Sequence, residues 1–236
     1  MCVENLKIAG WLKSSFIDFP GTVSTVLFFS GCNLRCPYCH NPEIVSGRIL
    51  QDTSINDVKQ YLIKRHGIID GVVLSGGEPT LYDTLPEITS EFRSLGLKIK
   101  LDTNGLRPEM ILKCNPDYLA VDFKTDPQYY HKLGVTGSTS IQSLETTLDI
   151  VRSMGERAEV RITAAQGFVD ESIALLMAHY LNGISKVFIQ KVNVDTPTLD
   201  PAFAEKPQLS RNELEQIRDI ISFSGAKSCI IRGEEF

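Results

Sequence analysis

The feature that most constrains the fold is a regular alternation of short apolar segments with longer amphipathic ones. Parallel βαβ units have this pattern, with strands of about five residues separated by helices. The expected strands are residues 22–29, 71–74, 98–101, 118–123, 159–164 and 186–192. The expected helices are residues 55–66, 84–95, 108–113, 141–154, 171–181 and 212–222. The chain is therefore expected to fold as an α/β protein around a parallel sheet.

Six such units predict an incomplete (β/α)6 barrel of TIM type, with its core in about residues 22–194. Periodicity alone does not distinguish this barrel from a doubly wound flat sheet. A helix and an edge strand are expected after the core, over residues 210–232. Because 236 residues leave room for the barrel and little else, we expect residues 1–236 to form a single domain.

The charge balance and the hydropathy pattern exclude several classes of partner. The chain has 24 Lys and Arg against 29 Asp and Glu, a net charge of −5, and no basic run. Proteins that bind nucleic acid through phosphate contacts are usually basic, so no nucleic-acid partner is expected. No apolar segment reaches the roughly 18 residues of a membrane span, so no membrane partner is expected. These features predict a cytoplasmic protein with reduced thiols.

Three of the six cysteines lie close together in a loop over residues 30–41, at the spacing C-x3-C-x2-C. Such a group of thiols in a reduced compartment indicates a metal site. Structural zinc usually takes four ligands in two separated pairs, and no second pair is present. Thiolates at short spacings suit a 4Fe–4S cluster, in which Cys32, Cys36 and Cys39 would leave the fourth iron open. Cys114 and Cys229 are expected to be core or surface thiols, and Cys2 has no assigned role.

Polar and glycine residues follow the expected strands where their carboxyl ends would lie. In α/β barrels the active site is built at this edge, from the loops that follow the strands. These residues are therefore expected to converge on one mouth. They are Gly76, Gly77 and Glu78 after the second strand, Asp102 and Thr103 after the third, and Asp122 and Lys124 at the fourth.

The cysteine loop, with Tyr38 just before its third cysteine, resembles that of the radical S-adenosylmethionine (SAM) enzymes. Within that superfamily the chain is similar to the glycyl-radical-enzyme activases, and most to the activating proteins of anaerobic ribonucleoside-triphosphate reductase. The likeness is dense in residues 10–21 and 28–43 and thin after about residue 160. It implies a barrel of radical SAM type.

The resemblance implies two cofactors, one 4Fe–4S cluster with three cysteine ligands and SAM. The amine and carboxylate of SAM would chelate the fourth iron. Gly76 and Gly77 would allow a close backbone approach, and Glu78 would pair with the ammonium group of SAM. A plainer interpretation of Ser75–Pro79 is a tight turn that caps a helix.

The resemblance also implies a set of further SAM contacts. The carboxylate of Asp102, beside Thr103, would bind a cation or a ribose hydroxyl. Asp122 and Lys124, two apart on a strand, would lie at the methionine and ribose, or else form an ordinary ion pair. Arg161 would meet the SAM carboxylate or form a structural salt bridge. The remaining expected contacts are Tyr38, Cys39 and His40 at the adenine, Phe123 between the paired charges, and Asn193, which replaces a ribose-binding His of some members.

The implied reaction is the reductive cleavage of SAM by one electron from a donor such as flavodoxin or ferredoxin. The resulting 5′-deoxyadenosyl radical would take a hydrogen atom from a glycine of a partner enzyme, anaerobic ribonucleotide reductase. No catalytic side chain is expected beyond the cluster and SAM. Asp18 would face the glycyl loop of the partner, or simply lie in an N-terminal turn before the first strand.

Three alternatives stay open. One is an activase of another glycyl radical enzyme, of the pyruvate formate-lyase type. Another is a radical SAM enzyme that acts on a small molecule, like the 7-carboxy-7-deazaguanine synthases. The third, from a different class, is a non-catalytic iron–sulfur or zinc module, which would normally show a fourth cysteine at a suitable spacing.

Overall fold

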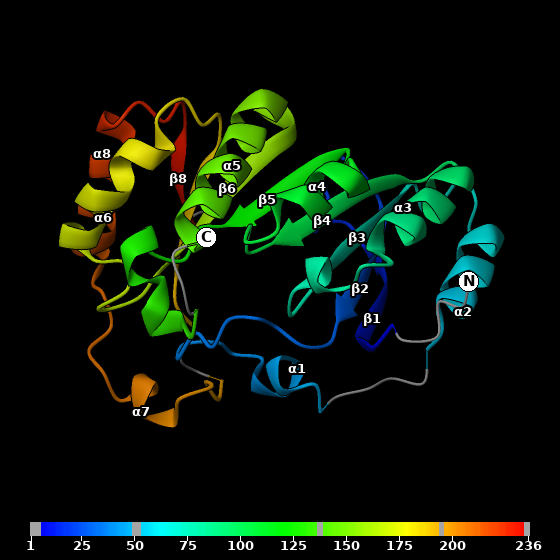
Figure 1. The fold of residues 1–236 in the computed structure, drawn as a ribbon, viewed down its shortest axis with the longest axis horizontal. Helices are drawn as coiled ribbons and strands as arrows, with labels where there is room; N and C mark the ends of the chain where they lie inside the picture. The colour runs from blue at the N-terminus through cyan, green and yellow to red at the C-terminus, as the bar shows by residue number, and fades with distance from the viewer. Residues whose placement is uncertain (1–5, 49–52, 136–138, 194–195, 234–236) are drawn as a thin grey trace. The chain divides into compact units, whose positions relative to one another are not determined.

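The structure, a computed structural model, describes residues 6–48, 53–135, 139–193 and 196–233. The chain forms two compact units, each with strands and helices of its own (Figure 1). Unit 1 comprises Met1–Asn33, Glu43–Thr103 and Glu109–Leu119. Unit 2 comprises Leu34–Pro42, Asn104–Pro108 and Ala120–Phe236. The boundary crosses the cysteine loop, and the single domain expected over residues 1–236 stays a prediction.

Unit 1 is built on four strands that are hydrogen-bonded in chain order. β1 (Ile8–Ser15) runs antiparallel to β2 (Ser24–Phe29), whereas β2, β3 (Gly71–Gly76) and β4 (Lys98–Thr103) run parallel. The parallel strands are rich in buried Val, Leu and Ile side chains, which is typical of strands inside an α/β fold.

The helices that follow these strands are amphipathic. They are α1 (Pro42–Ser46), α2 (Ile55–Lys64), α3 (Leu85–Ser94) and α4 (Pro108–Cys114), with a short 3₁₀ helix over Pro79–Leu81. The first turn of α2 is fixed by a capping box. The Asp57 N–H donates to Ser54 Oγ at 3.1 Å, and the Ser54 N–H donates to Asp57 Oδ2 at 3.0 Å. Ser54 is therefore the N-cap of this helix.

Unit 2 contains three parallel strands, β6 (Ala158–Ala164), β7 (Val187–Lys191) and β8 (Cys229–Arg232). β5 (Tyr118–Asp122) reaches the unit boundary, and the N–H of Phe123, just after it, donates to Arg161 O of β6 at 2.9 Å. Three longer helices, α5 (Thr139–Met154), α6 (Glu171–Ala178) and α8 (Arg211–Phe223), belong to this unit, and α8 packs against α6 and β8 (Figure 1). The shorter helices are α7 (Pro201–Ala204) and the 3₁₀ segments Pro127–Leu133, Gly155–Arg157 and His179–Leu181.

The six expected strands and the C-terminal edge strand are all present, with the ends of the six strands within two residues of the expected ones. Among the strands and α-helices of the described residues, β1, α1 and α7 were missed. β1 lacks an alternating apolar pattern, and three of its eight residues, Leu12, Lys13 and Ser14, are exposed. α1 and α7 are only five and four residues long. In the described residues no helix combines the length and the hydropathy that a membrane span requires.

Candidate functional site

The glycine turn after β3 lies against the start of the cysteine loop within unit 1. The Gly77 N–H donates to Phe29 O at 2.8 Å, and the Glu78 N–H donates to Gly31 O at 2.9 Å. A Cβ on Gly77 would lie 1.9 Å from Gly31 O, and one on Gly76 would lie 2.3 Å from Phe29 N. Only glycine fits at these two positions, because the chain's own backbone lies against them. The close approach to SAM predicted for Gly76 and Gly77 stays a prediction.

Glu78 is fully buried directly after this turn. Its Oε1 accepts hydrogen bonds from the Thr80 N–H at 3.0 Å, from Thr80 Oγ1 at 2.6 Å and from Thr103 Oγ1 at 2.7 Å. The carboxylate therefore caps the 3₁₀ helix over Pro79–Leu81, as the plainer interpretation proposed. Its contact with the ammonium group of SAM stays a prediction.

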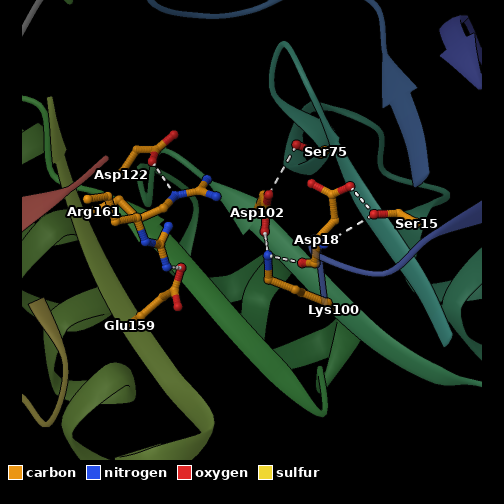
Figure 2. A network of polar contacts seen from close by, with 9 residues as sticks. Ser15, Asp18, Ser75, Lys100, Asp102, Asp122, Glu159 and Arg161 are labelled. Carbon is orange, nitrogen blue, oxygen red and sulfur yellow. Dashed lines mark hydrogen bonds and ion pairs between the residues drawn. The ribbon is translucent and has the colours of Figure 1, made fainter. Parts of the chain in front are cut away.

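Asp102, at the end of β4, is held by two side chains of unit 1 (Figure 2). Lys100 Nζ lies 2.9 Å from Asp102 Oδ1, and Ser75 Oγ donates to Asp102 Oδ2 at 3.2 Å. Lys100 Nζ also donates to the backbone O of Asp18 at 2.6 Å. The sequence analysis missed Lys100, although a lysine two residues before Asp102 on the same strand face was a signal that could have found it.

Asp18 lies in a turn directly before the strand expected over residues 22–29, as the alternative interpretation had it, and this turn joins the additional strand β1 to β2. Ser15 Oγ donates to Asp18 Oδ2 at 2.5 Å and accepts from the Asp18 N–H at 3.2 Å. Phe19 is buried next to it, in a cluster with Val26, Val73 and Tyr118. The turn is thus fixed to the sheet from inside, and its contact with a partner stays a prediction.

The three clustered cysteines are divided between the units, with Cys32 in unit 1 and Cys36 and Cys39 in unit 2. None of the three forms a disulfide. The Cys39 N–H donates to Cys36 O at 3.0 Å, which closes a tight turn around the aromatic position between them. Burial raises the pKa of the Cys36 thiol, and the nearby ammonium of Lys124 partly opposes this effect.

Tyr38 is buried inside unit 2. Its ring contacts Phe168 and Phe203, with centroid distances of 5.3 and 5.7 Å, and its hydroxyl donates to Lys124 O at 3.5 Å. The ring therefore packs within the protein, and the predicted contact with adenine is untested. The neighbouring His40 is exposed at the surface, and the partial desolvation of its imidazole, followed by Lys124, lowers the pKa of that group.

A segment distant in sequence holds the backbone of the cysteine loop. The Leu199 N–H donates to Cys39 O at 2.8 Å, and the Asp200 N–H donates to Pro37 O at 2.9 Å. Asp200 also caps α7, because its Oδ1 accepts from the Ala202 N–H at 3.1 Å. This segment was missed by the sequence analysis, although Asp followed by Pro is a known start signal for a helix.

Asp122, at the end of β5, is paired with two cations of unit 2. Lys124 Nζ lies 3.2 Å from Asp122 Oδ2. Arg161 Nε donates to Asp122 Oδ1 at 2.8 Å, a contact that Figure 2 shows. Burial raises the pKa of the Asp122 carboxyl, but Arg161 and Lys124 outweigh it and hold that pKa well below its ordinary value. The alternative of ordinary ion pairs thus describes the contacts present, and the predicted SAM contacts of these residues are untested.

The two other expected contacts of unit 2 differ in burial. Phe123 is fully buried, with its ring 5.9 Å from that of Tyr180, so it packs in the core. Asn193 is exposed, two residues after the end of β7. The SAM contacts expected for Phe123 and Asn193 stay predictions.

The donor set fits the implied cluster in its chemistry. Three thiols without disulfides lie on one loop, and Lys124 favours the thiolate form of Cys36. In the described part of the chain, no three His, Cys, Asp or Glu side chains are grouped closely enough to hold a single metal ion. Ligation by Cys32, Cys36 and Cys39 therefore rests on the chemistry of the donors and on similarity to other proteins.

Comparison with known proteins supplies that similarity. Residues 26–179 match the family model of the Radical SAM superfamily. A protein of Methanocaldococcus jannaschii assigned as a glycyl-radical enzyme activating enzyme is 29% identical over 225 residues, which cover 90% of each chain. The pyruvate formate-lyase-activating enzyme of Clostridium pasteurianum is 28% identical, with 85% of this chain and 91% of the relative covered. The 7-carboxy-7-deazaguanine synthase of Aquifex aeolicus is 38% identical over only 88 residues, 36% of this chain and 37% of that enzyme.

Solved structures are similar in fold. Streptococcus suis SuiB bound to the precursor peptide SuiA matches with a TM-score of 0.61 at 15% identity, over 88% of this chain and 48% of that one. QueE from Escherichia coli matches with a TM-score of 0.53 at 15% identity, over 95% and 93%. Together with the family match, these structures confirm the expected fold class, an incomplete TIM-type barrel of radical SAM type.

Proposed function

This chain is an enzyme of the radical SAM superfamily, and we propose that it is an activase that generates a glycyl radical on a partner enzyme. The observation that carries the proposal is the similarity to an assigned glycyl-radical enzyme activating enzyme, which extends over 90% of both chains. Similarity to a pyruvate formate-lyase-activating enzyme over most of both chains supports it. We propose anaerobic ribonucleotide reductase as the partner, because residues 10–21 and 28–43 most resemble the activating proteins of that reductase.

The superfamily implies a 4Fe–4S cluster and SAM as cofactors. We propose that Cys32, Cys36 and Cys39 hold the cluster and that SAM occupies the iron without a cysteine ligand. When bound and reduced, the cluster supplies the electron that cleaves SAM and so produces the species that takes a hydrogen atom. Lys124 favours the ligand form of the Cys36 thiol, because its ammonium stabilises a nearby thiolate.

The proposed role of the other site residues is to bind and orient SAM. Gly77 and Glu78 place a rigid turn beside Gly31, next to the first cysteine. Thr103 stabilises the Glu78 carboxylate that would receive the SAM ammonium group. The further proposed contacts are Asp102 at the ribose, Asp122, Lys124 and Arg161 at the methionine and ribose, Tyr38, Cys39 and His40 at the adenine, and Gly76, Phe123 and Asn193 around them.

The partner surface is proposed to include the turn between β1 and β2. Phe16 and Ile17 in this turn are 78% and 89% exposed, and the next residue is Asp18. Exposed apolar side chains at a fixed turn favour a protein partner. We further propose flavodoxin or ferredoxin as the electron donor, a cytoplasmic location, and a single domain that comprises both units.

The experiment that tests the function has two steps. Cluster-loaded protein, reduced without oxygen in the presence of SAM, should release 5′-deoxyadenosine and methionine. With the anaerobic reductase added, a glycyl radical signal should appear by electron paramagnetic resonance, and the Cys36→Ala variant should give neither product nor signal. Release of both products without a signal on the reductase, but with one on pyruvate formate-lyase, would reassign the partner.

A radical SAM enzyme that acts on a small molecule is the second candidate. The 38% identity to a 7-carboxy-7-deazaguanine synthase over 88 residues favours it, as a local similarity. Its discriminating test is turnover of the synthase substrate by the same protein preparation. Product formation without any glycyl radical on either partner enzyme would replace the activase with this function.

A further inference from the structure

Lys100 is a buried lysine in the middle of β4. Only 5% of its side chain is exposed, and lysines are rarely buried unless they are paired. Its ammonium lies 2.9 Å from Asp102 Oδ1 and donates to Asp18 O at 2.6 Å, as Figure 2 shows. The Tyr118 ring, with its centroid 5.9 Å from Nζ, adds a cation–π contact. Three partners thus fix this ammonium in one place.

Asp102 consequently carries its own counter-ion. Its side chain is 11% exposed, so the ion pair is largely shielded from solvent and weakly screened by salt. A metal cation that approached the same carboxylate would meet the fixed positive charge of Lys100 at short range. A hydroxyl group would meet no such barrier, and Oδ2 already accepts a hydrogen bond from the hydroxyl of Ser75 at 3.2 Å.

We propose that Lys100 is a positioning residue whose ammonium acts as the resident cation of Asp102. The carboxylate of Asp102 therefore binds hydroxyl groups and does not bind metal cations. Of the two ligand types expected at Asp102, the ion pair favours the ribose hydroxyl. This assignment of the ligand rests on the proposed function, whereas the exclusion of a metal cation rests on Lys100 and Asp102 alone. The same ammonium ties the turn at Asp18 to the end of β4, so the turn and the carboxylate are positioned together.

The test compares Lys100→Met with wild-type protein in potassium chloride and in choline chloride at equal ionic strength. Wild-type protein should show the same melting temperature and the same SAM affinity in both salts. Lys100→Met removes the ammonium but keeps most of the apolar stem. In choline chloride it should bind SAM about tenfold more weakly, because Asp102 is left without its charged partner. Potassium should restore most of this affinity and raise the melting temperature, because a metal cation then replaces the ammonium.

Lys59→Met is the matched control, because Lys59 forms an ion pair with Glu91 at 3.3 Å on the partly exposed surface. It should leave SAM affinity unchanged in both salts. If Lys100→Met does not fold, Lys100→Met with Asp102→Asn removes both charges and should restore folding without any dependence on potassium. The proposal would be overturned if the melting temperature or the SAM affinity of wild-type protein depended on potassium. It would also be overturned if a folded Lys100→Met variant had the same melting temperature and the same SAM affinity in both salts.

These outcomes are distinguishable from a failure of the proposed function. The melting temperatures of the cluster-loaded protein are measured without SAM, partner enzyme or reductant. A salt response confined to Lys100→Met would support the resident cation even if no glycyl radical formed on any partner. If a glycyl radical formed on a partner enzyme but the melting temperature of wild-type protein depended on potassium, the result would support the proposed function and reject the role of Lys100.

Discussion

The hydroxyl of Thr103 donates a hydrogen bond to Oε1 of Glu78 at 2.7 Å, inside unit 1. Glu78 follows β3 and Thr103 is the last residue of β4, so one buried carboxylate joins the ends of two adjacent strands. Two stretches that the sequence analysis assigned separately to SAM are therefore coupled. A substitution at Thr103 is therefore expected to move the segment that carries Glu78, and a substitution at Glu78 to move the end of β4.

Replacement of Thr103 by Val tests this coupling. The change keeps the shape of the side chain and removes one of the donors to the buried carboxylate. We expect the free energy of unfolding, measured in urea, to fall by about 2 kcal/mol, because hydrogen bonds to charged groups contribute more than neutral ones. Thr89→Val is the control, since Thr89 donates to a backbone carbonyl of α3, and it should cost about 1 kcal/mol. Equal losses in the two variants would contradict the coupling.

Gly77→Ala should disrupt the contact between the glycine turn and the cysteine loop. The new Cβ would lie 1.9 Å from Gly31 O, so the backbone must move, and we expect a loss of more than about 3 kcal/mol in unfolding free energy. Gly96→Ala is a matched control, because Gly96 has φ +80° but open space around it. It should cost about 1 kcal/mol through backbone strain alone. Iron content after reconstitution should fall in the first variant only.

Single Ala substitutions of the cysteines test the ligand assignment. Cys32→Ala, Cys36→Ala and Cys39→Ala should each lose the absorbance of the 4Fe–4S cluster after anaerobic reconstitution. Cys114→Ala and Cys229→Ala should retain it. A cluster that survives in one of the first three variants but disappears in Cys114→Ala would reassign the ligands. Cys2, which lies outside the described residues, should be replaced by Ser in all these proteins, so that its thiol cannot take the place of a missing cluster ligand.

Cys114 should resist alkylation in the folded protein at pH 8. It is 2% exposed, and burial raises the pKa of its thiol to about 12, so almost no thiolate is present. Burial raises the pKa of the Cys229 thiol to about 12 as well. Iodoacetamide labelling followed by mass spectrometry should find both residues unmodified, and urea should expose them. Rapid labelling of Cys114 in native protein would show that its surroundings open readily.

The stability of the protein should depend on Asp122 in acid. Burial raises the pKa of its carboxyl, but Arg161 and Lys124 lower that pKa well below the ordinary value of 3.8. Between these values the unfolded state binds a proton that the folded state does not, so stability is present above about pH 4 and decreases as the pH falls. Asp122→Asn should therefore be less stable than wild type at pH 6, and the difference should shrink by pH 3.

Urea unfolding at pH 6, 4 and 3 measures this difference. Asp219→Asn is the control, because Asp219 pairs with Arg218 in an exposed position, and it should change stability by less than about 1 kcal/mol. A difference between wild type and Asp122→Asn that stays constant from pH 6 to pH 3 would contradict the proposed role of the ion pairs.

Much of the fold could be predicted because buried parallel strands and amphipathic helices leave strong periodic patterns. The expected strand 71–74 is apolar and is followed by the polar Ser75, and the expected strand 118–123 is apolar except for Asp122 near its end, so their positions were clear. β1 carries no such pattern, because Trp11, Leu12 and Lys13 lie on an edge strand that is partly exposed. Its antiparallel pairing with β2 is a tertiary property that no local signal records.

The candidate site was predictable where spacing carries chemistry, and less so where tertiary contacts decide. Cys32, Cys36 and Cys39 were selected as candidate ligands from their spacing alone, and their ligation of a cluster stays a prediction. The carboxylate of Glu78 accepts hydrogen bonds from Thr80 and Thr103, and that of Asp122 accepts one from Arg161. These contacts depend on how loops and strands meet in the folded chain. Lys100 was overlooked because a lysine in a strand normally indicates an exposed face, whereas here a pair of acceptors stabilises it inside.

The hydrogen bonds from Leu199 and Asp200 to the cysteine loop have a consequence for how the protein is made. The cysteines leave the ribosome first, whereas the residues that hold Pro37 and Cys39 follow about 160 residues later in the chain. During translation the loop therefore lacks its final support and its thiols are accessible to iron delivery and to oxidation.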